Sequence, residues 1–252
     1  MEFVRDQKIV RGELMQIIIT MAGLGTRFRK AGYDCPKYMI QVKGKTLFEW
    51  SMDSLLGYRN HVSKYVFVVR AEDKAGTFIR NRCNKYAIMN YDIVELSHMT
   101  DGQATTCMLA IPYCNQDESI LVFNIDTYVE PFEMKYEDIS GEGHIPCFHA
   151  DGDHWSFVRL NEKGIVVEVQ EKQRISDNCT LGAYFFSSAR LYKELYTEYY
   201  SDERHLEKKE KYIAPLYNAM IEKKMTITIS IIDRNKVHVL GTPEELQFFL
   251  NE

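Results

Sequence analysis

Features that would mark a membrane or secreted protein are missing from this 252-residue sequence. It has no apolar run of about 18 residues, the length that a membrane-spanning helix needs, and no signal-peptide core. Its six cysteines include no Cys-x-x-Cys pair, so neither a zinc site nor a disulfide framework is indicated. We therefore expect a cytoplasmic protein without a membrane span, whose thiols are reduced.

An excess of positive charge is also missing, because 31 Lys and Arg face 36 Asp and Glu and the formal net charge is -5. A chain without a basic face lacks the main attraction to phosphate backbones, so we expect no nucleic-acid partner. The hydrophobic fraction of 45% and charged fraction of 27% are typical of a globular protein. We assign residues 15–252 to one large domain and residues 1–14 to an N-terminal extension. The sequence leaves the oligomeric state open, and an oligomer is compatible with it.

Two widespread phosphate-binding motifs are absent. A dinucleotide fingerprint would need glycine where Phe28 stands, and a Walker loop would need glycine where Met39 stands. No Ser-His-Asp or Cys-His constellation is present either, and we expect His149, His154 and His238 to pack or to face solvent. Covalent catalysis through a side-chain nucleophile is therefore not expected.

A different phosphate loop is nevertheless indicated near the start of the chain. Residues 17–19 form a β-branched run typical of a buried parallel strand, and Gly23 and Gly25 follow it. Glycines allow backbone N–H groups to converge on an anion, and Arg27 and Lys37 add fixed positive charge. This combination suits a triphosphate. A plain glycine-rich turn is the alternative explanation for the two glycines alone.

Apolar strands alternate with helices through the first half of the chain. Residues 46–49, Thr-Leu-Phe-Glu, match a capping box and open an amphipathic helix. We expect strands at 17–19, 65–69, 91–96 and 119–123, and helices at 46–56, 73–85 and 103–111. Such alternation implies right-handed crossovers and an α/β fold with a Rossmann-like, doubly wound, mostly parallel sheet.

The pattern changes after residue 143. The turn sequence 161–164 separates two short strands and predicts an inserted antiparallel hairpin. We expect strands at 145–150, 155–159, 165–171, 177–186, 225–232 and 237–240, helices at 189–200, from 212 and from 242, and a solvated surface connection at 201–211.

Polar residues follow two of the predicted parallel strands. In doubly wound sheets ligands collect beyond the carboxyl ends of the strands, and Gly102 and Gln103 lie after the third strand. Gln103 can both donate and accept a hydrogen bond. Asn124 and Asp126 follow the fourth strand, and a carboxylate placed there can hold Mg²⁺ beside a triphosphate. A plain turn before a helix and a carboxylate that caps its own loop are the alternatives.

The motif Gly-x-Gly-Thr-Arg at 23–27, followed by Pro-Lys at 36–37, resembles the nucleotidyltransferase family of sugar-nucleotide pyrophosphorylases. Gly-Thr-Pro-Glu-Glu-Leu at 241–246 resembles the family's closing signature, and the resemblance spans about residues 15–250. It implies a GT-A-like fold with the hairpin on the acceptor side. It also implies a Mg²⁺-dependent transfer of a nucleoside monophosphate from an NTP to a phosphorylated small molecule, with release of pyrophosphate.

The resemblance further implies roles for single residues. Arg27 would contact the departing pyrophosphate, Lys37 would neutralise phosphate in the transition state, and Lys172 would meet the acceptor phosphate. Asp126 would be the metal ligand. The implied nucleotide-binding residues are Ala22, Gly23, Gly25, Thr26, Gly102, Gln103 and Asn124, and the implied acceptor-binding residues are Trp155, Glu171 and Gly182. A solvated charged run is the alternative for 171–174.

One position departs from the family pattern. Many members carry a second metal-binding aspartate where this chain has Val239, and Asp233 is the nearest replacement. Segments 124–130, 155–157 and 175–178 are similar to a branch found in bacterial capsule clusters. That branch implies CTP as nucleotide and L-glutamine phosphate as acceptor, in capsule biosynthesis. A sugar-1-phosphate uridylyl- or guanylyltransferase and a non-catalytic nucleotide sensor remain the alternatives.

Overall fold

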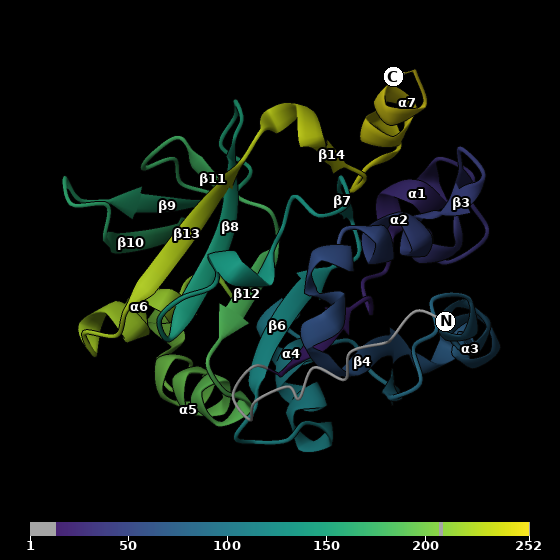
Figure 1. Cartoon of the computed structure of the whole chain (residues 1–252). Helices are drawn as coiled ribbons and strands as arrows, with labels where there is room; N and C mark the ends of the chain where they lie inside the picture. Colours follow the sequence, from purple (N-terminus) through teal and green to yellow (C-terminus); the bar gives the residue numbers. More distant parts are fainter. Residues whose placement is uncertain (1–13, 207–208, 252) are drawn as a thin grey trace, which may run out of the picture.

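Residues 14–206 and 209–251 are described by a computed structural model of the chain. The predicted N-terminal extension, residues 1–14, lies outside the described residues apart from Leu14. The strands of the main sheet are β1 (Met15–Thr20), β4 (Val62–Arg70), β5 (Tyr91–Leu96), β6 (Ser119–Asn124), β8 (Gly143–His149), β9 (Ser156–Leu160), β10 (Val166–Glu171), β11 (Asn178–Thr180), β12 (Ala183–Phe186) and β13 (Ile227–Ile232). They lie in the order β10-β9-β11-β8-β12-β6-β1-β4-β5, and β13 pairs with β8 (Figure 1).

The four strands β6, β1, β4 and β5 are parallel to one another. β1 lies in the middle of this group, and Ile17, Ile18 and Ile19 are fully buried because helices cover both faces. The predicted Rossmann-like, doubly wound arrangement is therefore confirmed. Since all four strands run the same way, the loops that follow β1, β5 and β6 meet at one edge of the sheet.

The other half of the sheet is mainly antiparallel and includes the predicted hairpin β9-β10. The prediction of one strand at 177–186 was wrong, because the chain forms β11 and β12 with a break at Leu181 and Gly182. Gly182 has a φ of +77°, a left-handed conformation that interrupts the extended backbone. The break lets β11 pair with β9 while β12 pairs with β6.

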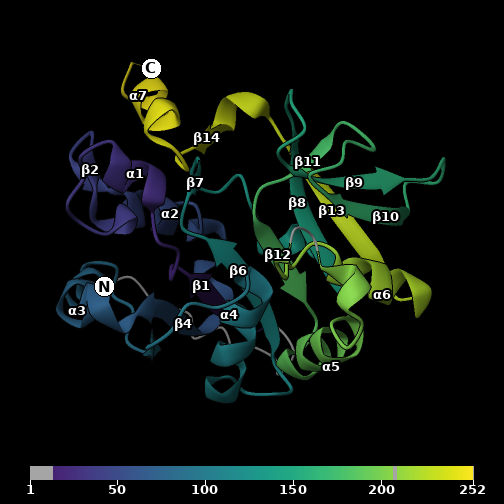
Figure 2. The ribbon, with the colours of Figure 1, turned by 180° about the vertical axis from the view of Figure 1, so that it is seen from behind.

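Helices cover both faces of the sheet. The α-helices are α1 (Thr26–Lys30), α2 (Leu47–Asp53), α3 (Gly76–Lys85), α4 (Gln103–Ala110), α5 (Ala189–Tyr199), α6 (Leu216–Glu222) and α7 (Pro243–Asn251). One core cluster joins α2 and α3 to the sheet through Phe48 and Ile79, and a second joins α4, α5 and α6 through Cys107, Tyr192 and Tyr217. Figure 2 shows α4 and α5 next to each other on the second face.

Several helix boundaries differ from the predicted ones. Lys74 adopts a left-handed φ of +48°, so the helix predicted from residue 73 begins at Gly76. The predicted capping box of Thr46 and Glu49 is confirmed, but α2 ends at Asp53. The helix predicted from residue 212 begins at Leu216. Short 3₁₀-helices are η1 (Lys37–Met39), η2 (Leu56–His61), η3 (Ala71–Asp73), η4 (Ile111–Tyr113), η5 (Tyr136–Asp138), η6 (Glu203–His205) and η7 (Arg234–Lys236).

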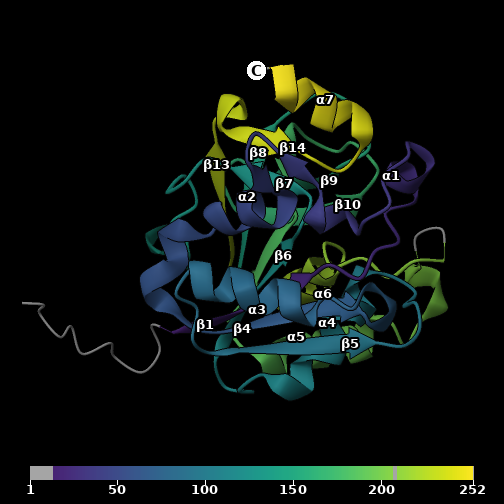
Figure 3. The same cartoon turned by 90° about the vertical axis from the view of Figure 1, so that its right-hand side faces the viewer.

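A smaller apolar cluster connects α1 to the C-terminal helix α7. It joins Phe28 of α1 to Tyr128 and to Leu246 and Phe249 of α7. Two small antiparallel sheets lie around it: β14 (Val237–Val239) with β7 (Thr127–Val129), and β2 (Gln41–Val42) with β3 (Lys45–Thr46). Figure 3 shows α7 beside β14 at the top of the molecule. This cluster anchors the glycine loop, because Phe28 is the buried residue of α1.

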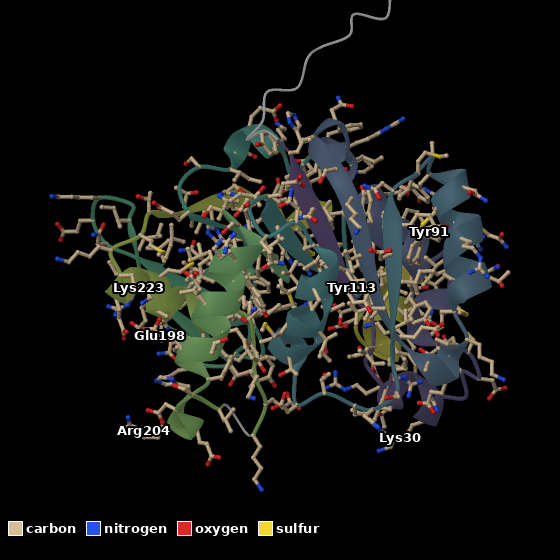
Figure 4. The ribbon with its side chains drawn as sticks, turned by 90° about the horizontal axis from the view of Figure 1, so that it is seen from below. Lys30, Tyr91, Tyr113, Glu198, Arg204 and Lys223 are labelled. Carbon is tan, nitrogen blue, oxygen red and sulfur yellow. The ribbon has the colours of Figure 1, made fainter. Side chains whose placement is uncertain are left out.

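The surface bears dispersed ion pairs. Glu198 of α5 and Lys223, which follows α6, approach to 2.8 Å on the outer side of these two helices (Figure 4). All six cysteines are free thiols; Cys35 is exposed and the other five are buried. Among the described residues, no helix combines the length and the apolar character that crossing a membrane requires.

His144 of β8 is a buried histidine between two hydroxyls. Its ring nitrogens lie 2.8 Å from Thr228 Oγ1 and 3.1 Å from Ser230 Oγ, both in β13. Burial lowers the pKa of His144 from its ordinary value of 6.5 to about 4. The unfolded chain therefore binds a proton at a pH where the folded chain does not, and stability is lost as the pH falls from about 6.5 toward 4.

We expect His144 to lower the free energy of unfolding by about 2 kcal/mol between pH 7 and pH 5. Urea unfolding at both values measures the loss, and His144→Gln should show a smaller pH dependence because glutamine does not titrate. His149→Gln, at an exposed position of the same strand, is the matched control. An unchanged pH dependence in His144→Gln would contradict the prediction.

Candidate active site

The glycine loop connects β1 to α1. Gly25 precedes the helix with a left-handed φ of +61°, and a Cβ on it would lie 3.5 Å from the Cβ of Lys37. The loop therefore packs against the segment that carries Lys37. Arg27 is exposed and forms no ion pair with any described residue, so its charge is available to a ligand.

A cavity of about 540 Å³ lies beyond the carboxyl ends of β1, β5 and β6. Residues from all three following loops line it, as the parallel topology requires. Every predicted nucleotide-binding residue, both predicted catalytic residues of the loop and the predicted metal ligand line this cavity: Ala22, Gly23, Gly25, Thr26, Gly102, Gln103, Asn124, Arg27, Lys37 and Asp126. A nucleoside triphosphate is of suitable size for such a space.

Lys37 and Asp126 form an ion pair at the centre of the site. Lys37 Nζ lies 3.0 Å from Asp126 Oδ2, with exposed fractions of 14% and 41% for the two side chains. Asp126 is the second residue after β6, and Lys37 is the first residue of η1. The carboxylate is thus partly open to the cavity, and the ammonium of Lys37 balances its charge.

The described residues contain no group of three or more His, Cys, Asp or Glu arranged to hold a metal. Val239 lies in β14 opposite Thr127. Asp233 accepts a hydrogen bond from the backbone N–H of Asn235 and does not line this cavity. Asp126 does line the cavity, and its role as metal ligand stays a prediction.

Gln103 is fixed by two polar side chains at the ends of β1 and β6. Its Nε2 donates to Thr20 Oγ1 at 3.0 Å and to Asn124 Oδ1. Both amide hydrogens are thereby engaged, so the carbonyl oxygen is the part left for a ligand. The sequence prediction that Gln103 supplies a donor as well as an acceptor is therefore not supported by this geometry.

Residues 209–213 form a strap over the Gly102 turn. The backbone N–H of Lys211 donates to the carbonyl of Asp101 at 2.8 Å, and the N–H of Ala104 donates to the carbonyl of Lys211 at 3.0 Å. A Cβ on Gly102 would lie 2.3 Å from that Lys211 oxygen, so glycine is required for this contact. Glu210 of the strap lines the 540 Å³ cavity. The predicted surface connection at 201–211 is confirmed for the exposed Lys209 and Glu210, whereas Lys211 is half-buried against the Gly102 turn.

The strap is also held by charge. Asp101 and Lys211 form an ion pair at 2.9 Å. Burial alone would raise the pKa of Asp101, but hydrogen bonds from Thr105 and Lys211 outweigh burial and hold that pKa below its ordinary value. The Asp101 carboxylate is therefore engaged within the protein.

A second cavity of about 220 Å³ adjoins the first and shares Gln103, Asn124 and Asp126 with it. The three predicted acceptor-binding residues Trp155, Glu171 and Gly182 line it. A Cβ on Gly182 would lie 2.4 Å from Asn124 Nδ2, so only glycine allows β12 to start this close to the end of β6. The two cavities thus meet at Asn124 and Asp126.

One wall of the second cavity is polar although it is buried. Ser156 Oγ donates to Glu171, and the hydroxyls of Thr180 and Tyr184 lie 3.0 Å apart. Burial raises the pKa of Tyr184, so its hydroxyl stays protonated near neutral pH. The sequence did not point to Ser156, Thr180 and Tyr184 in this cavity, because hydroxyl residues within strands carry no distinguishing pattern. It did not point to Tyr212 either, which lies in the strap.

Lys172 lies at the edge of the second cavity and does not line it. Its backbone is left-handed, with φ of +53°, and its N–H donates to the carbonyl of Trp155 at 2.8 Å. Its Nζ donates to the hydroxyl of Tyr212 and lies 3.8 Å from Glu171 Oε1. The contact of Lys172 with an acceptor phosphate stays a prediction.

Known proteins share this architecture. No protein-family model matches the chain. The chain is 27% identical over 160 residues to a probable UDP-N-acetylglucosamine pyrophosphorylase of Encephalitozoon cuniculi (strain GB-M1), a match that covers 63% of this chain and 39% of the longer protein. An inositol-1-phosphate CTP transferase from T. maritima matches with a TM-score of 0.73 at 17% identity, covering 96% of this chain and 98% of that one. That likeness concerns the fold.

One solved structure is similar in sequence as well. The nucleoside-diphosphate-sugar pyrophosphorylase from Vibrio cholerae RC9 is 37% identical, with a TM-score of 0.87, and the match covers 94% of this chain and 100% of that one. The predicted nucleotidyltransferase fold is thereby confirmed. With such identity along nearly its whole length, this chain belongs to the nucleotidyltransferase family that includes the nucleoside-diphosphate-sugar pyrophosphorylases.

Proposed function

We propose that this protein transfers a nucleoside monophosphate from an NTP to a phosphorylated small molecule, forming a nucleoside-diphosphate conjugate and pyrophosphate. The observation that carries the proposal is the junction of two cavities at Asn124 and Asp126, with Lys37 paired to Asp126. A triphosphate in the larger cavity and an acceptor in the smaller one would bring their phosphates together at this junction.

The reaction is a direct displacement at phosphorus. An acceptor phosphate oxygen forms a bond to the α-phosphorus, the bond between that phosphorus and the oxygen bridging to the β-phosphate breaks, and its electrons leave with pyrophosphate. The acceptor phosphate is already ionised at neutral pH, so no general base is needed. Arg27 and Lys37 supply positive charge where negative charge develops, and the cavity walls align the two substrates.

The residues at the junction fit a magnesium ion. Mg²⁺ takes oxygen ligands and is often bound by one or two carboxylates together with substrate phosphates. Asp126 provides such a carboxylate, 41% exposed and open to both cavities. When bound, the ion would neutralise phosphate charge; Lys37 is the cation that pairs with Asp126 in the structure described here.

CTP is the proposed nucleotide. With both amide hydrogens engaged by Thr20 and Asn124, Gln103 offers a ligand its carbonyl oxygen. The exocyclic amine of cytosine can donate to that oxygen, whereas the corresponding carbonyl of uracil would face it acceptor to acceptor. An unsatisfied polar group of this kind costs roughly 1 to 3 kcal/mol, about tenfold to a hundredfold in selectivity.

The proposed acceptor is L-glutamine phosphate, which would give CDP-L-glutamine for capsular phosphoramidate modification. The proposal rests on the resemblance of the whole sequence to CTP:phosphoglutamine cytidylyltransferase. It is supported by the carboxylate of Glu171 in the wall of the second cavity, with Lys172 at the edge. Groups of both signs suit a zwitterionic amino-acid head.

We expect CTP with phosphoglutamine to give the highest kcat/KM. Pyrophosphate release with each of the four common NTPs, against phosphoglutamine and glucose 1-phosphate, measures it. UTP should be slower than CTP by about tenfold or more, for the reason given for Gln103. A higher kcat/KM with a sugar phosphate and UTP or GTP would instead identify a sugar-1-phosphate uridylyl- or guanylyltransferase. Nucleotide binding without any pyrophosphate release would identify a sensor.

A further inference from the structure

The strap, residues 209–213, contacts both cavities. Glu210 lines the nucleotide cavity, and Tyr212 and Ile213 line the second cavity. These residues are neighbours in the chain, so the strap joins the two cavities.

A chain of hydrogen bonds crosses the strap. The hydroxyl of Tyr212 donates to Glu210 Oε2 and accepts from Lys172 Nζ, which also lies 4.3 Å from the centre of the Tyr212 ring. One phenol thus links a carboxylate of the nucleotide cavity to the lysine at the edge of the second cavity. Hydrogen bonds to charged groups are stronger and shorter than neutral ones, so the link constrains both partners.

The strap is attached to the rest of the protein at Lys211, in its middle. Lys211 is bound to the Gly102 turn by two backbone hydrogen bonds and by the ion pair with Asp101. The carbonyl of Tyr212 accepts a hydrogen bond from the hydroxyl of Tyr200. The backbone of the strap is therefore fixed, and the side chains of Glu210 and Tyr212 are the parts that can change position when a ligand binds.

Glu210 has a second oxygen for which the described residues provide no hydrogen-bond partner. A nucleotide hydroxyl or amine that donates to this oxygen pulls the Glu210 carboxylate toward the nucleotide. The Tyr212 hydroxyl and Lys172, which are linked to that carboxylate by hydrogen bonds, shift with it. Coupling between two binding sites is reciprocal, so an acceptor phosphate bound to Lys172 changes the affinity for nucleotide by the same factor as nucleotide changes the affinity for the acceptor.

We propose that Tyr212 is a positioning residue that couples nucleotide binding to acceptor binding through Glu210 and Lys172. This proposal rests on the proposed function, because it takes the two cavities as the nucleotide and acceptor sites. Loss of the hydroxyl removes both hydrogen bonds while the aromatic ring keeps its packing. Each ligand then still binds, but binding of one no longer changes the affinity for the other.

The test compares the wild-type chain with Tyr212→Phe by calorimetry. The dissociation constant of an α,β-methylene analogue of CTP is measured without and with a saturating second ligand. That ligand is the acceptor that supports turnover, or inorganic phosphate where none does. We expect the second ligand to tighten nucleotide binding about tenfold in the wild type, and by less than about twofold in Tyr212→Phe. Affinity for the nucleotide analogue alone should change by less than about threefold, because Tyr212 does not line the nucleotide cavity.

Tyr196→Phe is the matched control, because it also removes a hydroxyl that contacts the strap, at Lys211, but lies outside the chain from Glu210 to Lys172. It should keep the tenfold coupling. Glu210→Gln should lose coupling, and adding it to Tyr212→Phe should cause no further loss, as expected for residues that act as one unit.

Equal losses of coupling in Tyr196→Phe and Tyr212→Phe, or no coupling in the wild type, would overturn the proposal. Turnover without coupling leaves the proposed function intact, whereas absence of pyrophosphate release refutes that function and not the coupling.

Discussion

Replacement of Lys37 by alanine is expected to lower kcat by about 100-fold or more, the size seen when one group that stabilises transition-state charge is removed. Lys37 Nζ lies at the junction of the two cavities, 3.0 Å from Asp126, and its side chain is only 14% exposed. A cation in this place acts on charge that spreads during transfer, so kcat should fall more than the affinity for nucleotide.

Steady-state kinetics with saturating CTP measures the effect. Lys30→Ala is the matched control: it removes a positive charge of the same loop region, but Lys30 is exposed at the end of α1 and lines neither cavity at the junction (Figure 4). It should stay within about twofold of the wild type because exposed charges are screened. Circular dichroism checks that the Lys37→Ala fold persists. A rate near that of the wild type in Lys37→Ala would remove Lys37 from the mechanism.

The parts of the fold that local pattern determines were predictable. The β-branched run of β1, the capping box of Thr46 and Glu49 and the hairpin turn at 161–164 each depend on residues within a few positions of one another. The edge where the loops meet was predictable as well, because parallel strands place their carboxyl ends together. Local order of elements was therefore enough to bring Gly23, Gln103 and Asp126 to one cavity.

What the sequence could not predict depends on contacts between distant segments. The break between β11 and β12 arises because Gly182 must lie against Asn124, 58 positions earlier in the chain. Lys211 contacts the Gly102 turn through backbone atoms, and such contacts cannot be recognised from the residue type. A charged stretch that ends in a site therefore has the same composition as a solvated one, and the place of Glu210 in the cavity wall was missed for that reason.

The exchange of Asp126 for asparagine separates a metal ligand from a simple ion-pair partner. Asparagine keeps the size of the side chain but loses the charge, so the Mg²⁺ concentration for half-maximal rate should rise, and turnover should fall by about 100-fold. Lys37 would lose its partner at the same time, and a purely structural role for the ion pair would instead lower thermal stability while leaving the Mg²⁺ titration unchanged.

Activity against Mg²⁺ concentration, together with melting temperature, therefore decides between the two roles of Asp126. Asp233→Asn completes the experiment, since Asp233 caps η7 and lines neither cavity at the junction. A shift of the Mg²⁺ titration in Asp126→Asn but not in Asp233→Asn would identify Asp126 as the protein's carboxylate for the ion. A shift in Asp233→Asn would show that η7 moves toward the junction when substrates bind, because Asp233 reaches neither cavity in this structure. An unchanged titration in both variants would refute the assignment of Asp126, and the charge of Lys37 and Arg27 would then have to stabilise the transferred phosphate without a carboxylate-bound ion.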